Sequence, residues 1–87
     1  MEKIEISVLF EINKDIFSHK TKEGVMKEVA EQILAQKLEV VDCADIWGPF
    51  FYVIFKDASH RKNQFEKLLK EIFKDNEKVE IIKIELG

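Results

Sequence analysis

Two polar stretches of this sequence carry the side chains best suited to chemistry. Asp15, Ser18 and His19 follow the first predicted strand, and Asp57 and His60 follow the third. Both stretches lead into predicted helices, whose free N–H groups and dipole favour anions. Imidazole and carboxylate groups can also bind a metal ion. We expect both stretches at the same end of the sheet, which would bring the two histidines together.

A plainer interpretation is that Asp57 or Ser59 caps a helix and that the two histidines are solvated. No spacing within the stretches defines a metal or catalytic site. The first stretch also lacks the Cys-x-x-Cys of copper chaperones and the arginine of acylphosphatases, which share the fold derived below. The sequence therefore predicts a non-enzymatic protein, with no catalytic residues, no metal site and no cofactor.

Composition limits the classes of molecule that the protein is expected to bind and the cellular compartment in which it is expected. The net charge is −3 and Arg61 is the single arginine, which disfavours a nucleic-acid binder. Cys43 is the single cysteine and lies between acidic residues, so we predict a packed, unreactive thiol. The sequence has no signal-peptide pattern and no apolar run that could span a membrane. We expect a cytoplasmic protein without membrane contact.

Apolar periodicity predicts six elements along the chain. Strands are predicted at 4–12, 38–46, 50–55 and 79–86, and helices at 21–36, with Thr21 as N-cap, and at 60–74. In the last strand, Ile82, Ile84 and Leu86 are expected to face the core.

This order of elements predicts one domain over residues 1–87, with no length left for a second. Right-handed crossovers in both β-α-β halves give an α+β, ferredoxin-like β-α-β-β-α-β fold. Its four-stranded antiparallel sheet carries both helices on one face. Strands 4–12 and 50–55 are expected side by side in the centre.

The strand at 50–55 is apolar on both of its faces. Whichever set of its side chains faces away from the helices forms, with Leu9, a surface too apolar to be left to water. The candidate interface residues are Leu9, Phe51, Tyr52, Val53 and Phe55. Because Phe51, Val53 and Phe55 point to one face of the strand and Tyr52 to the other, one of these two sets is to be removed once the orientation of the strand is known. We expect a homodimer through this face or through an edge strand.

Single-stranded RNA binding is one alternative. Residues 50–55 resemble the second half of the RNP1 motif of RNA-recognition modules, which stack bases on exposed aromatic residues. However, Gly48 and Pro49 stand where that motif has a basic residue and glycine, and Phe51 stands where it has glycine or alanine. With the acidic net charge, these departures disfavour nucleic acid as the partner.

Three segments resemble ACT-type domains, which are small-molecule-sensing domains with this fold. Residues 24–33, beginning at Gly24, resemble the start of the first ACT helix, and residues 38–42 resemble the second strand. Phe50 and Phe51, with Asp57 and Ser59, resemble the third strand and the turn after it. Residues 13–23 depart from the family because this loop is longer and lacks its proline.

The resemblance implies a regulatory module that pairs with itself or with a partner and responds to a small ligand. The nearest candidates for a ligand site are His19, Gly24, Asp57 and His60. We therefore expect a non-enzymatic binding module that self-associates and senses a small molecule. The alternatives are an RNA-binding domain and a metal- or anion-binding protein that uses His19 and His60.

Overall fold

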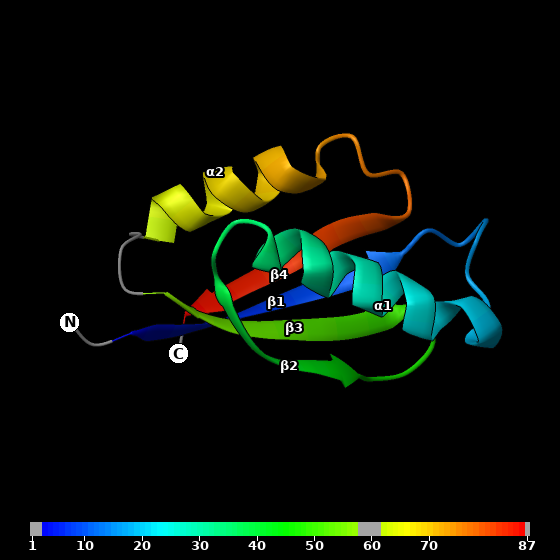
Figure 1. Ribbon diagram of the computed structural model, residues 1–87. Helices are drawn as coiled ribbons and strands as arrows, with labels where there is room; N and C mark the ends of the chain where they lie inside the picture. Colours follow the sequence, from blue (N-terminus) through cyan, green and yellow to red (C-terminus); the bar gives the residue numbers. More distant parts are fainter. Residues whose placement is uncertain (1–2, 58–61, 87) are drawn as a thin grey trace.

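Four strands and two helices follow one another in the predicted order in the computed structural model, which describes residues 3–57 and 62–86 (Figure 1). The strands are β1 (Ile4–Ile12), β2 (Glu39–Asp45), β3 (Phe50–Asp57) and β4 (Val79–Leu86). The helices are α1 (His19–Leu34) and α2 (Lys62–Phe73). The strands form one antiparallel sheet in the order β2-β3-β1-β4, so the ferredoxin-like α+β fold is confirmed.

Both helices lie on the same side of the sheet (Figure 1). The core is built from the alternate β1 residues that face the helices, from three β3 residues and from the apolar faces of α1 and α2. Phe10 is central to it: its ring stacks on Phe51 at a centroid distance of 5.3 Å and meets Phe73 edge-on at 5.1 Å. We call this side of the sheet the core face.

The orientation of β3 removes three of the candidate interface residues. Phe51, Val53 and Phe55 are completely buried against the helices, so they belong to the core and their assignment to an interface was wrong. The physical reason is register. Phe51 pairs with Phe10 and Val53 pairs with Val8, and directly opposite residues in an antiparallel pair point to the same face.

A β-bulge changes the faces of β4. Phe10 pairs with Ile81 whereas Leu9 pairs with Lys83, which leaves Ile82 as an extra residue. Because a bulge breaks the alternation of side chains, Ile82 turns away from the core and is 46% exposed. The prediction that Ile82 faces the core was therefore wrong.

A second bulge interrupts β2. Val40 pairs with Phe55 and Asp42 pairs with Ile54, so Val41 has no partner on β3 and is 50% exposed. Both edge strands of the sheet therefore carry a bulge, and each bulge exposes a large apolar side chain.

The first helix begins earlier than predicted. Ser18, not Thr21, is its N-cap, because the Ser18 side chain accepts a hydrogen bond from the backbone N–H of Thr21 at 3.2 Å. For the second helix, Asp57 still belongs to β3, while Ser59 and His60 lie outside the described residues.

Candidate functional site

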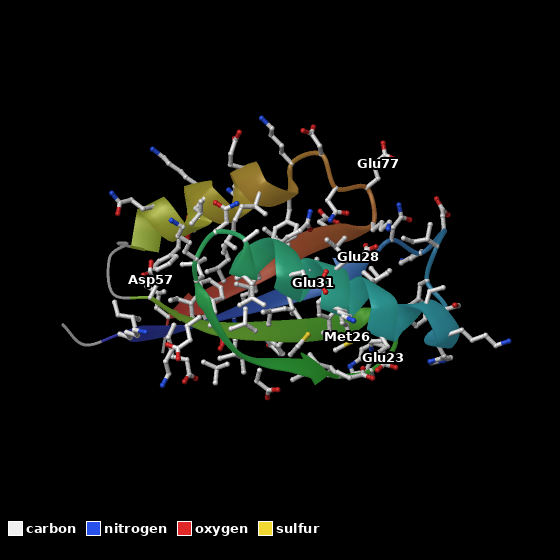
Figure 2. All side chains as sticks on the ribbon, in the orientation of Figure 1. Glu23, Met26, Glu28, Glu31, Asp57 and Glu77 are labelled. Carbon is white, nitrogen blue, oxygen red and sulfur yellow. The ribbon has the colours of Figure 1, made fainter. Side chains whose placement is uncertain are left out.

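His19 and Asp57, one from each polar stretch, lie at opposite ends of the sheet and not at the same end. β1 and β3 are antiparallel, with Ile4 opposite Asp57 and Glu11 opposite Phe50. The chain therefore leaves β1 at one end and leaves β3 at the other, and the ends are about 25 Å apart along the strands. Figure 2 shows Asp57 far from Glu23, which lies near the start of α1.

Among the predicted ligand residues that the structure describes, His19 and Asp57 are consequently not brought together. His19 is exposed at the start of α1, where its ring meets that of Phe17 edge-on at a centroid distance of 5.5 Å. Gly24 is exposed on the same helix, and a Cβ added there would meet no atom within 4 Å. Asp57 is half-buried at the opposite end, and His60 lies outside the described residues. Within the described part of the chain, no group of three or more His, Cys, Asp or Glu side chains could hold a metal ion.

The end that carries His19 is held together by backbone contacts between loops. The Asn13 N–H donates to the carbonyl of Lys78 at 2.8 Å, and the Ile12 N–H donates to that of Pro49 at 2.8 Å. A hollow of about 520 Å³ lies here, lined by Glu11, Asp15, Glu77 and Glu80 among others. These side chains make the hollow acidic, which opposes the anion-binding function predicted for this loop.

A larger groove of about 710 Å³ lies between α1 and the loop from α2 to β4. Glu28, Glu31 and Glu77 gather around it (Figure 2). Lys78 crosses it to pair with Glu28 at 2.9 Å, and Asn76 donates to Gln32 at 3.1 Å. These contacts fasten the loop to the helix.

The remaining candidate is the side of the sheet that neither helix covers, which we call the open face. Its residues follow from the register: Glu5, Ser7, Leu9 and Glu11 on β1; Phe50, Tyr52, Ile54 and Lys56 on β3; Glu39, Asp42 and Ala44 on β2; Glu80, Lys83 and Glu85 on β4. Leu9, Phe50, Tyr52 and Ile54 lie on the two central strands, are half-buried, and form what we call the apolar centre.

Exposed apolar side chains extend this surface beyond the central strands. Val41 and Ile82 border the open face at the two bulges. Trp47, in the turn between β2 and β3, is 69% exposed, and its ring lies 5.2 Å from that of Phe50. Gly48 allows this tight turn because its φ of +54° is accessible to glycine at little cost.

The sequence prediction found Leu9 and Tyr52 on this surface but missed Phe50 and Ile54. Alternation fixes the two sets of β3 side chains but does not say which set faces the helices. The hydroxyl of Tyr52 could have indicated the orientation of β3, because a tyrosine commonly keeps its hydroxyl group on the side that faces water.

Ion pairs surround the apolar centre. Lys3 donates to Glu39 at 2.9 Å, and this hydrogen bond, with the charge attraction behind it, lowers the pKa of Glu39 and raises that of Lys3. Lys83 pairs with Glu85 at 2.5 Å, which raises the pKa of Lys83. The carboxylates on the open face are more numerous than the lysines, so its rim is acidic.

Two further polar side chains of β2, those of Asp45 and Cys43, contribute to the structure of the domain. Lys22 of α1 is the only charged residue recorded as buried in the described part of the chain, and it pairs with Asp45. Cys43 is half-buried, and burial, followed by the charges of Asp42 and Asp45, raises the pKa of its thiol. This direction agrees with the predicted unreactive thiol.

No protein-family model matches this chain, and no curated protein matches it significantly. The resemblance to ACT domains therefore stays a prediction. Neither helix, as far as the structure describes them, is long and apolar enough to cross a membrane.

Proposed function

We propose that this protein is a non-enzymatic binding module that self-associates through the open face of its sheet. The observation that carries the proposal is the pair of unlike faces: both helices cover the core face, while Leu9, Phe50, Tyr52 and Ile54 form an apolar centre that neither helix covers. A small ligand is not part of the proposal, because His19 and Asp57, two of the residues predicted to bind one, lie at opposite ends of the domain.

The physical chemistry of the open face supports an interface. Burial of apolar surface contributes about 25 cal/mol per Å², and aromatic residues are enriched where protein interfaces are most fully buried. Phe50, Tyr52 and Trp47 supply aromatic area, while the charged residues lie around them as a polar rim. This combination of an apolar centre and a polar rim is typical of protein–protein contact surfaces.

RNA binding is the runner-up, because Phe50 and Tyr52 are both on the open face, where RNA-recognition modules keep their stacking residues. The charge of the face argues against it. Glu5, Glu11 and Glu80 would repel a phosphate backbone, whose neutralisation by lysine and arginine supplies most of the affinity in nucleic-acid complexes.

The test is the solution mass by light scattering, measured over a range of concentrations for the wild type, Tyr52→Glu and Leu34→Glu. We expect a wild-type dimer, and we expect Tyr52→Glu to be a folded monomer because the buried charge would have no partner. Leu34 is the matched control, since it is a 51% exposed apolar residue on α1. Leu34→Glu should remain a dimer.

Two results would contradict the proposal. The first is a wild-type monomer at every concentration, and the second is a dimer that Tyr52→Glu leaves intact. In the first case, titration with single-stranded RNA at low salt, for the wild type and Tyr52→Ala, examines the runner-up.

A further inference from the structure

We propose that two copies of this chain pack open face against open face, about a two-fold axis that runs parallel to the strands between β1 and β3. This inference rests on the proposed function and gives it a geometry. It follows from the state of the sheet edges, the size of the open face and the positions of its charges.

The edges of the sheet oppose the other route to a dimer, which is pairing of edge strands. β2 is interrupted at Val41 and β4 at Ile82. A bulge twists an edge strand and disrupts the regular ladder that another strand would have to join. The exposed side chains of both bulges add apolar surface beside the open face, so the bulges favour contact through the face.

The size of the open face indicates a flat partner. Four strands about 4.8 Å apart, and about eight residues long at 3.3 Å each, give a projected area on the order of 500 Å². A standard interface buries about 800 Å² of accessible surface on each partner. A partner must therefore cover essentially the whole face. A second sheet of the same size does so, whereas a single extended peptide does not.

The charges select the axis. A two-fold axis parallel to the strands places β1 of one copy over β3 of the other. Leu9 and Glu5 pair with Tyr52 and Lys56 within one chain, so the same pairs meet between copies. Leu9 then packs on Tyr52, and Glu5 lies near Lys56, twice by symmetry.

The alternative axis, perpendicular to the strands, is less favourable. It would lay Glu5 of one copy near Glu11 of the other and Lys56 near Phe50. It would also bring Lys83 of one copy near Glu85 of the other, but this contact adds little because the two side chains already pair within each chain. The parallel axis brings one like-charged pair together at the rim, Asp42 and Glu85, but Lys83 already neutralises Glu85 at 2.5 Å. The balance of charges therefore favours the parallel axis.

The experiment uses two complementary charge variants of the full chain, Lys56→Glu and Glu5→Lys. Each variant alone puts like charges at both symmetric contacts, so each should dimerise about tenfold more weakly than the wild type. When the two variants are mixed, opposite charges meet again at both contacts. Native mass spectrometry of the mixture should show mainly heterodimers.

Glu71 and Lys74 provide the matched control. They form an exposed pair at 2.8 Å at the C-terminal end of α2, with Glu71 in the helix and Lys74 directly after it. Lys74→Glu and Glu71→Lys should dimerise like the wild type, and a mixture of them should contain the statistical half of heterodimer. Circular dichroism checks that all four variants are folded.

The outcomes separate this inference from the proposed function. If the wild type dimerises and Tyr52→Glu dissociates it, but Lys56→Glu and Glu5→Lys show no preference for each other, the axis is wrong and the proposed function stands. If the wild type does not dimerise, both are overturned. Preferential heterodimers with the first pair and not with the control pair would support the geometry.

Discussion

Cys43 illustrates how a single residue responds to its surroundings. Its Sγ lies 3.9 Å from the carbonyl oxygen of Met26, and partial burial, followed by the charges of the nearby carboxylates, raises the pKa of the thiol. A raised pKa reduces the fraction of reactive thiolate at any pH below it.

We predict that iodoacetamide alkylates Cys43 more slowly in the folded protein than in urea at pH 8, because unfolding removes the burial that raises the pKa of the thiol. Asp42→Asn should increase the folded-state rate, since it removes one of the charges that raise the thiol pKa. Mass spectrometry of timed samples measures both rates. A folded rate equal to the unfolded rate would show that the thiol is not protected.

Residue identity also limits what the sequence can predict. Leu9 was assigned to the uncovered side because β1 alternates between apolar and mixed residues. β3 has no such contrast, so Phe51 and Tyr52 were equally good candidates until the pairing with β1 placed Phe51 beside Phe10. Which of these two residues is buried depends on contacts between strands, and the pattern within a single strand does not contain those contacts.

Among the elements, α1 shows how a helix start is chosen between two suitable residues. Ser18 has an extended backbone, and its hydroxyl lies 3.0 Å from that of Thr21. Thr21 sits three residues into the helix and donates from its hydroxyl to the carbonyl of Ile16 at 3.3 Å. Both residues therefore stabilise the first turn, but only Ser18 is the cap.

We predict that Ser18→Ala lowers the free energy of unfolding by about 1 kcal/mol, because the Thr21 N–H loses its side-chain acceptor and keeps only the Ser18 carbonyl. Ser18→Asp should retain the stability of the wild type, since aspartate is an equally good cap. Urea unfolding followed by circular dichroism gives both values. Equal losses for the alanine and aspartate variants would contradict the capping role.

The bulges mark the limit of prediction for the strands. All four strands were predicted close to their observed bounds because β-branched and aromatic residues concentrate in them. The inserted residues Val41 and Ile82 were not anticipated, because a valine or isoleucine in a bulge has the same local pattern as one in a regular strand.

At the scale of the whole molecule, the order of elements determined the sheet, whereas the positions of the loops were predicted wrongly. The topology that puts β1 beside β3 also makes them antiparallel, so the loops after them had to lie at opposite ends. The correct placement was contained in the predicted fold, and His19 and Asp57 were never neighbours.

We predict that the melting temperature of the wild type rises by several degrees over a hundredfold increase in protein concentration, because mass action favours a dimer that must dissociate on unfolding. Tyr52→Glu should melt at one temperature at every concentration, and Leu34→Glu should follow the wild type. Differential scanning calorimetry measures all three. A wild-type melting temperature independent of concentration would argue against a stable dimer.

The contact between Trp47 and Phe50 has an optical consequence. Trp47 is the single tryptophan in the sequence, and its indole lies at the end of the open face, largely in water. Indole emission moves to shorter wavelength when water is removed from the ring, so the protein carries its own fluorescent reporter at this surface. Covering the open face should shift the emission to the blue, without any added dye.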